Sequence, residues 1–216
     1  MPEFPGPDDR NALAADCRRC PALVEHRTRI SWGNGPRDAD LFVVGEAPAA
    51  GDPDADRWQG GNHTGMAYTS RRSGRKVRQL VADLDYGDAY YTNAVKCFPA
   101  DTASSTEASD HEPTDNREPT AREREHCRPY LVSEIDAVAP TVVLATGKHA
   151  TQSVLAAEGR SIDGGFLDAV LDPITLSGLA TTLVPVLHPS YEEVWRSRLG
   201  YDDRERYVSA VRSALP

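Results

Sequence analysis

The four cysteines of this chain have a spacing that suits metal binding. Cys17 and Cys20 form a C-x-x-C pair, and Cys97 and Cys127 follow singly. Disulfides are rare in a reducing cytosol, whereas thiolates are soft ligands that favour zinc and iron–sulfur centres. The sequence therefore predicts a metal centre that joins the N-terminal segment to the middle of the chain.

Three short motifs carry other side chains that could do chemistry. They are Gly-Glu-Ala-Pro with Glu46, Thr-Asn-Ala-Val-Lys-Cys with Asn93, and His-Pro-Ser with His188. A carboxylate can stabilise a neighbouring positive charge, an amide both donates and accepts hydrogen bonds, and an imidazole can donate to a developing oxyanion. The alternatives are local roles, in which Glu46 caps the next turn, Asn93 bonds its own turn and His188 is structural.

Apolar runs and helical patterns alternate along the chain and would position these motifs. We expect strands at 41–45, 89–95, 141–145 and 182–187, and helices at 75–84, 119–138, 148–157 and 203–214. This alternation predicts an α/β fold, a three-layer sandwich with a central, mainly parallel four-stranded sheet and helices on both faces. Because ligands bind beyond the carboxyl ends of parallel strands, the three motifs should share one pocket.

Length and composition bound the class of protein. The 216 residues, 39% of them hydrophobic, suit one domain over 1–216. No apolar run approaches the roughly 18 residues of a membrane span, and the first residues lack the basic and apolar regions of a signal peptide. We therefore expect a monomer in the cytoplasm with no membrane partner.

Charge is distributed unevenly. The net charge is −9, with 33 acidic residues, and only three of the 24 basic residues are lysines. Such a surface is typical of proteins from a salt-rich cytoplasm, where charge is strongly screened, and we expect a halophilic source. Against this background, a cationic segment stands out as either a phosphate-contacting patch or a solvated helix face: Arg71, Arg72, Arg75, Lys76 and Arg78. By contrast, residues 100–115 are acidic and polar and predict a loosely ordered insertion.

Taken in order, these motifs resemble the iron–sulfur families 4 and 5 of the uracil-DNA glycosylase superfamily. The resemblance runs from Cys17 to the last helix and includes Asn116-Arg117-Glu118-Pro119 before a helical cysteine. It implies a [4Fe–4S] cluster on Cys17, Cys20, Cys97 and Cys127. Zinc on the same thiolates is the alternative.

The resemblance also implies a role for each motif residue. Glu46 and His188 would be catalytic, with Glu46 orienting the attacking water and His188 donating to the uracil oxygen. The substrate would be bound by a stacking aromatic, an amide that reads the uracil edge, and two further polar residues: Tyr68, Asn93, Asn116 and Ser190. Arg71, Arg72, Arg75 and Lys76 would contact DNA.

The implied function is a monofunctional DNA glycosylase that flips uracil out of single- or double-stranded DNA and starts base-excision repair. Two departures keep alternatives open. A family-4-like Glu46 is combined with a family-5-like glycine-rich loop, which leaves Asp52 as a second candidate carboxylate. After His-Pro-Ser, two glutamates interrupt the expected aliphatic wedge, so that Tyr191, Val194 or Trp195 would insert into DNA. The alternatives are a glycosylase-like module that binds DNA without turnover and a zinc-stapled nucleic-acid-binding domain.

Overall fold

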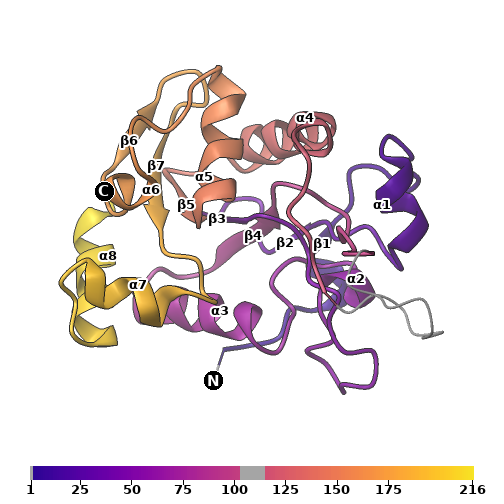
Figure 1. Cartoon of the computed structure of the whole chain (residues 1–216), viewed down its shortest axis with the longest axis horizontal. Helices are drawn as coiled ribbons and strands as arrows, with labels where there is room; N and C mark the ends of the chain where they lie inside the picture. The colour runs from indigo at the N-terminus through magenta and orange to yellow at the C-terminus, as the bar shows by residue number, and fades with distance from the viewer. Residues whose placement is uncertain (1, 103–114) are drawn as a thin grey trace.

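The protein is an α/β sandwich of three layers (Figure 1), seen in a computed structural model that describes residues 2–102 and 115–216. Its central sheet has seven strands in the order β1-β2-β4-β3-β5-β7-β6. Four adjacent strands are parallel and confirm the predicted sheet: β4 (Ala89–Asn93), β3 (Leu41–Gly45), β5 (Val142–Thr146) and β7 (Thr181–Val186).

Three short antiparallel strands extend this sheet beyond the four that the sequence predicts. β1 (Arg10–Asn11) and β2 (Gly33–Asn34) lie beside β4, and β6 (Ile174–Leu176) pairs with β7. With two or three residues each, they are too short to show an alternating pattern, which needs about four residues to be visible. The four-stranded prediction is therefore right for the parallel centre and incomplete at both edges.

Helices cover both faces of the sheet. α4 and α5 lie on one side in Figure 1, and α3 and α7 lie on the other. The helices with eight or more residues are close to their predicted ranges: α3 (Ser73–Asp83), α4 (Ala121–Val138), α5 (Lys148–Leu155) and α8 (Arg204–Ala214). Shorter helical segments complete the described chain: η1 (Pro7–Asp9), α1 (Pro21–His26), α2 (Gly61–Thr64), η2 (Ala156–Glu158), α6 (Phe166–Ala169) and α7 (Glu192–Arg198). None of the helices in the described residues is long and apolar enough to cross a membrane.

Alternation along the strands creates two apolar cores, one on each face. Leu41 and Val43 of β3 pack toward α3 and α8, whereas Phe42 and Val44 pack toward α4 and α5. Every residue of β3 is buried, as expected for a parallel strand covered on both sides. This double burial explains why the strand reads as a continuous apolar run.

The start of α4 is set by a capping box. The hydroxyl of Thr120 accepts a hydrogen bond from the Glu123 backbone N–H, and the Glu123 carboxylate accepts one from the Thr120 N–H. These bonds satisfy two backbone donors that the first helical turn leaves free.

The segment just before this cap pairs with residues 99–101, because Asp101 N–H donates to Asp115 O and Arg117 N–H donates to Pro99 O. Most of the predicted insertion at 100–115 lies outside the described residues.

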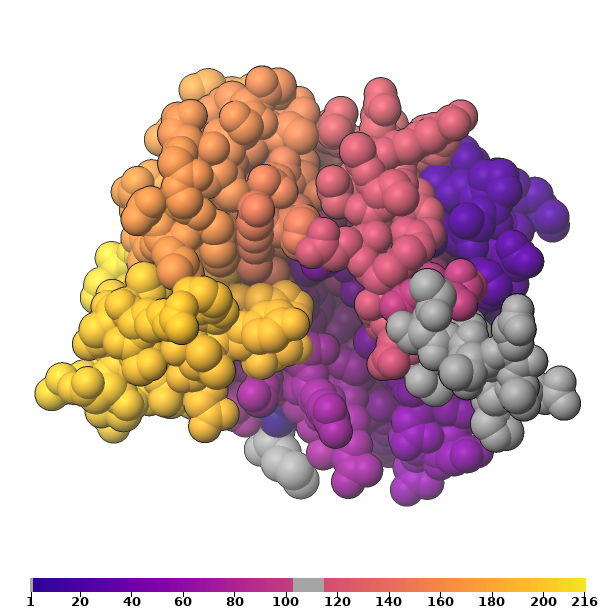
Figure 2. Space-filling model, in the orientation of Figure 1, coloured from indigo at the N-terminus to yellow at the C-terminus, as the bar shows by residue number. Residues whose placement is uncertain are grey.

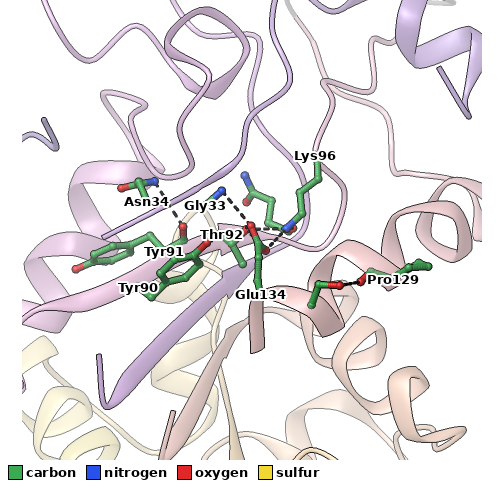
Figure 3. Close-up of polar contacts among 10 residues, drawn as sticks. Gly33, Asn34, Tyr90, Tyr91, Thr92, Lys96, Pro129 and Glu134 are labelled. Atoms are coloured by element: carbon green, nitrogen blue, oxygen red, sulfur yellow. Dashed lines mark hydrogen bonds and ion pairs between the residues drawn. The ribbon is translucent and has the colours of Figure 1, made fainter. Parts of the chain in front are cut away.

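A buried ion pair ties α4 to the segment that follows β4 (Figure 3). Lys96 and Glu134 are each 1% exposed, and their Nζ and Oε2 atoms are 2.5 Å apart. Lys96 also donates to the Thr92 hydroxyl and to the Asn93 carbonyl, at 2.7 and 2.6 Å. The Thr92 hydroxyl in turn donates to Glu134 at 2.8 Å. Each charged atom thus has several partners, as a buried pair requires, and the backbone around Asn93 is held in place.

Candidate active site

A cavity of about 1200 Å³ opens beyond the carboxyl ends of β3, β4, β5 and β7. In the space-filling view it is the hollow near the centre of the visible face (Figure 2). Glu46, Asn93 and His188 all line it. The expectation that the three motifs share one pocket is confirmed, since each motif directly follows a parallel strand.

The floor of the cavity depends on Gly45, the last residue of β3. A Cβ on this residue would lie 2.5 Å from Asn93 Oδ1 and 2.8 Å from the Tyr68 hydroxyl oxygen. The absence of a side chain therefore lets Asn93 and Tyr68 approach each other across the strand end. Lys96 holds the Asn93 backbone by donating to its carbonyl at 2.6 Å, and Asn93 lines the cavity.

Tyr68 is held in a single orientation. Its hydroxyl lies 2.7 Å from Thr146 Oγ1, and Thr146 donates to the Val44 carbonyl at 3.3 Å. Because the Thr146 proton goes to Val44, the tyrosine donates and the threonine accepts. Tyr68 also has a φ of +54°, a left-handed conformation that costs a bulky residue free energy. Tyr68 lines the cavity.

His188 presents a hydrogen-bond donor. Its Nδ1 accepts from the Ser190 backbone N–H at 3.2 Å, so in the neutral ring the proton sits on Nε2. Burial lowers the pKa of His188, and the nearby His149 lowers it further. The geometry and the burial together favour a neutral imidazole whose Nε2–H can donate to an oxygen.

Glu46 is a half-buried carboxyl. Burial raises its pKa above the ordinary 4.5, and the charge of His149 opposes this rise. Its backbone carbonyl accepts from Val95 N–H at 2.9 Å, which joins the Glu46 loop to the loop after β4. A desolvated carboxylate at this point can stabilise a cationic centre or orient a water molecule.

Asn116 and Ser190 also line the cavity. Asn116 is exposed, and its amide donates to the Pro48 carbonyl at 3.0 Å, which couples the segment before α4 to the Glu46 loop. The Ser190 side chain is exposed, and its backbone orients His188. Both residues are therefore available to substrate, and Ser190 has the additional task of setting the histidine tautomer.

The four cysteines gather at one apolar cluster beside this site. Cys97 and Cys127 are buried, Cys17 and Cys20 are half-buried, and Leu23, Ile30, Trp32 and Val95 pack with them. Burial raises the pKa of Cys20 to about 11 and that of Cys127 to about 12. Arg27 donates to Cys97 Sγ at 3.3 Å, and His126 Nδ1 lies 3.3 Å from Cys20 Sγ.

This donor set fits a four-thiolate centre. Four free thiols from three distant segments lie together, and their charged forms repel one another in an apolar setting. A bound cationic centre would reverse that penalty. Among residues 2–102 and 115–216, no three His, Cys, Asp or Glu side chains stand close enough to hold a single metal ion. A single zinc ion would need the four sulfurs about 4 Å apart, because Zn–S bonds are about 2.3 Å. The described cysteines are not grouped that closely.

Comparison with known proteins gives the family. A family model described as "Uracil DNA glycosylase superfamily" matches residues 32–212. The chain belongs to this superfamily. A type-4 uracil-DNA glycosylase of Pyrobaculum aerophilum is 30% identical over 148 residues, covering 68% of this chain and 64% of the relative.

Both type-4 and type-5 uracil-DNA glycosylases are among the relatives. A type-5 uracil-DNA glycosylase of the same organism is 30% identical over 178 residues, which cover 68% of this chain and 69% of the relative. A type-4 enzyme of Thermotoga maritima is 27% identical and covers 81% of this chain and 77% of the relative. The chain thus spans about two thirds of the length of the first relatives, and its similarity to types 4 and 5 agrees with its mixed motifs.

The predicted cationic segment is divided among several places. Arg72 lines the cavity, and Lys76 donates to the Pro189 carbonyl at 3.3 Å. Arg71 and Arg75 border a separate shallow groove, where Arg75 lies 5.0 Å from the Trp58 ring. Arg78 is buried and bonds to Tyr68 O and Asn34 Oδ1, so it is an internal cation and not part of a surface patch.

The structure bears on two questions that the sequence left open: which carboxylate is the candidate acid, and which side chain is the candidate wedge. Asp52 is exposed and borders the separate groove, whereas Glu46 lines the cavity. Tyr191 and Val194 are 60% and 59% exposed. Trp195 instead packs against the core, with Arg198 over its ring at 4.4 Å. Glu46 is therefore the better candidate acid, and Tyr191 and Val194 are the better candidate wedges.

Sequence reasoning gave no role to His149, Thr146 or Glu118, which also line the cavity. His149 Nε2 lies 3.0 Å from Glu118 Oε1. Thr146 ends β5 and His149 follows three residues later, so the rule that placed the other motifs at strand ends would have found both. Glu118 stands in the motif before α4, but a loop position gave no sign of its contact with His149.

Proposed function

We propose that this protein is a monofunctional uracil-DNA glycosylase that flips uracil out of DNA and hydrolyses its N-glycosidic bond, starting base-excision repair. The observation that carries the proposal is that Glu46, Tyr68, Asn93 and His188 line one cavity at the ends of parallel strands. A volume of about 1200 Å³ exceeds typical small-ligand pockets, and suits a flipped nucleotide with part of its strand. Family membership supports the same substrate class.

Recognition of the uracil base would come from Tyr68 and Asn93. The Tyr68 ring offers a stacking surface for the flipped base. The Asn93 amide can donate to a carbonyl oxygen of uracil and accept from its imide N–H, a pattern that cytosine does not match. Asn116 and Ser190 would complete the polar rim.

Bond cleavage would draw on His188 and Glu46. As the bond between N1 and C1′ breaks, its electron pair leaves with uracil and positive charge builds on the sugar. The Nε2–H of His188 would stabilise the uracil anion, and the Glu46 carboxylate would stabilise the sugar cation and orient water. The water oxygen adds to C1′, and its proton is released toward Glu46.

Contacts with DNA would surround the cavity mouth. Arg72 lies on its rim and can neutralise a phosphate. Arg71, Arg75 and Lys76 are on the same helix start and would extend this contact. Tyr191 and Val194 project from the start of α7 and would fill the space that the flipped base leaves.

The four cysteines would carry a [4Fe–4S] cluster, which supplies crosslinks between distant segments and no step of the reaction. Cys97 follows the Asn93 loop and Cys127 lies on α4, so the cluster would stabilise one wall of the pocket. We further propose a single glycosylase domain that acts as a cytoplasmic monomer at high salt on single- or double-stranded DNA.

The test is release of uracil from labelled single- and double-stranded oligonucleotides, followed by alkali cleavage of the abasic product across a range of salt. We expect cleavage only at uracil, and loss of most activity in His188→Ala and Glu46→Gln. DNA binding without an abasic product at any salt concentration would instead identify a binding module. Metal analysis of the same preparation should give iron and sulfide, and zinc alone would contradict the cluster.

A further inference from the structure

His149 occupies a central place among the polar groups of the cavity. It is the second residue of α5, and Glu46, Glu118 and His188 line the same cavity from three other segments. Its Nε2 lies 3.0 Å from Glu118 Oε1. A carboxylate only accepts, so Nε2 carries a proton, and a second proton on Nδ1 makes the ring a cation.

The second nitrogen of His149 has no partner in the protein. Nδ1 is buried, and no hydrogen bond to it exists among residues 2–102 and 115–216. A buried polar atom without a partner is costly unless it serves a function. Glu118 therefore fixes the ring through Nε2, and a proton on Nδ1 would place a positive charge inside the cavity.

Both proposed catalytic groups respond to the charge on this ring. Burial favours the neutral form of Glu46, and the nearby charge of Glu118 adds to this effect. His149 opposes it more strongly than Arg124 does. Within residues 2–102 and 115–216, His149 is also the charged neighbour that acts on His188, and it favours the neutral imidazole. The His188 side chain lies close to the residue that precedes α5, since a Cβ added to Gly147 would be 3.0 Å from the His188 Cβ.

We propose that His149, anchored on Glu118, is a positioning residue that holds Glu46 ionised and His188 neutral. The inference rests on the proposed glycosylase function, whose chemistry needs these two charge states together. A single imidazolium favours both, because it attracts the carboxylate and repels a second imidazolium. Glu118 lies in the segment before α4 and keeps the ring in place. This segment therefore influences the charge states of Glu46 and His188.

Other charges near the cavity have to be considered in any pH experiment. Arg124 of α4 acts on Glu46 from the same side as Glu118, and Tyr191 lies 5.8 Å from the His188 ring. The remaining charged residues that line the cavity are Arg72, Asp115, Arg117, Glu118, Lys148 and Asp168. None of them is altered in the comparison below, so differences between variants report on His149.

The experiment is the pH dependence of single-turnover uracil release in wild type and His149→Gln. Loss of the cation should move the acid limb, which lies above pH 4.5, to a higher pH. Near pH 8, where Glu46 is ionised in both proteins, the two rates should agree within about threefold. His26→Gln, outside the cavity, is the matched control and should retain the wild-type profile.

An equal loss of rate at every pH, or an unmoved acid limb in His149→Gln, would overturn the proposal. A second variant, His149→Asn, covers the case in which His149→Gln fails to fold. In ¹⁵N-histidine NMR, the pKa of the His188 ring should be higher in either variant than in wild type, and an unchanged value would also overturn the proposal. A wild type without uracil release would refute the glycosylase function, while the NMR result would still decide the coupling.

Discussion

Individual side chains in the cavity act through a few strong local constraints. Gly45 permits a close approach of Asn93 and Tyr68, Thr146 directs the Tyr68 hydroxyl, and the Ser190 backbone selects the His188 tautomer. Each constraint removes a degree of freedom before substrate arrives. Preorganisation of this kind lowers the cost of reaching the transition state.

Glu46→Gln should stabilise the protein at neutral pH. The pKa of Glu46 is raised in the folded state, so its ionisation costs folding free energy once the pH exceeds the ordinary value of 4.5. Below that value both states bind the proton and the cost vanishes. We expect a higher melting temperature for the variant at pH 7 and none of this gain at pH 4. Glu125→Gln, on the exposed face of α4, controls for the loss of one negative charge, and an equal gain in both variants would contradict the prediction.

Gly45→Ala should damage the site more than the fold. The new methyl group would force Asn93 and Tyr68 apart, and a displacement of about 1 Å can reduce the rate about 100-fold. Overpacking should also lower the free energy of unfolding by about 1–3 kcal/mol. Uracil release and urea denaturation measure the two effects. Gly87→Ala is the control, because its Cβ would meet nothing within 4 Å, and equal effects in both variants would refute the packing argument.

At the scale of elements, α4 organises one side of the pocket. It contributes Glu134 to the buried ion pair and Cys127 to the thiol cluster, and its capping box fixes the segment with Asn116 and Glu118. The Lys96–Glu134 pair thus connects this helix to the loop that presents Asn93. A change in α4 should therefore reach the substrate pocket without touching substrate.

Lys96→Met should lower the free energy of unfolding by about 3–5 kcal/mol, because it leaves the Glu134 carboxylate buried without its cation. Adding Glu134→Met should recover part of the loss. Arg206→Met breaks an exposed pair with Asp202 and should cost about 0–1 kcal/mol. Chemical denaturation of the four proteins measures these differences. A double variant less stable than Lys96→Met alone would contradict this account.

At the scale of the molecule, the thiol cluster joins segments that the sheet does not connect directly. Cys17 and Cys20 precede α1, whereas Cys97 and Cys127 belong to the loop after β4 and to α4. A filled centre would crosslink the N-terminal segment to the wall of the pocket. Loss of this centre should therefore destabilise the N-terminal segment first.

Cys127→Ala should lose visible absorbance and most of its iron while it retains α/β secondary structure. Without the crosslink, the segment around Cys17 and Cys20 should become sensitive to limited proteolysis, because few apolar contacts would hold it. Iron content, circular dichroism and mass spectrometry of the fragments check these points. Full iron occupancy in the variant would rule out Cys127 as a ligand.

The sequence alone determined the type of fold and the chemistry available to it. Strands buried on both faces must be apolar throughout, so 41–45 and 141–145 were visible as runs, and the polar motifs after them could be placed at one edge of the sheet. The short edge strands had too few residues to show a period. The family followed from the same motifs in their order.

Only the tertiary structure decided how the side chains are used. It showed that Arg78 is internal, that Asp52 borders another groove, and that His149 meets Glu118 in the cavity that Glu46 and His188 also line. Periodic burial is a local property that neighbouring residues reveal. Contacts between loops depend on the paths of distant segments and on the direction of each side chain, which no local pattern records.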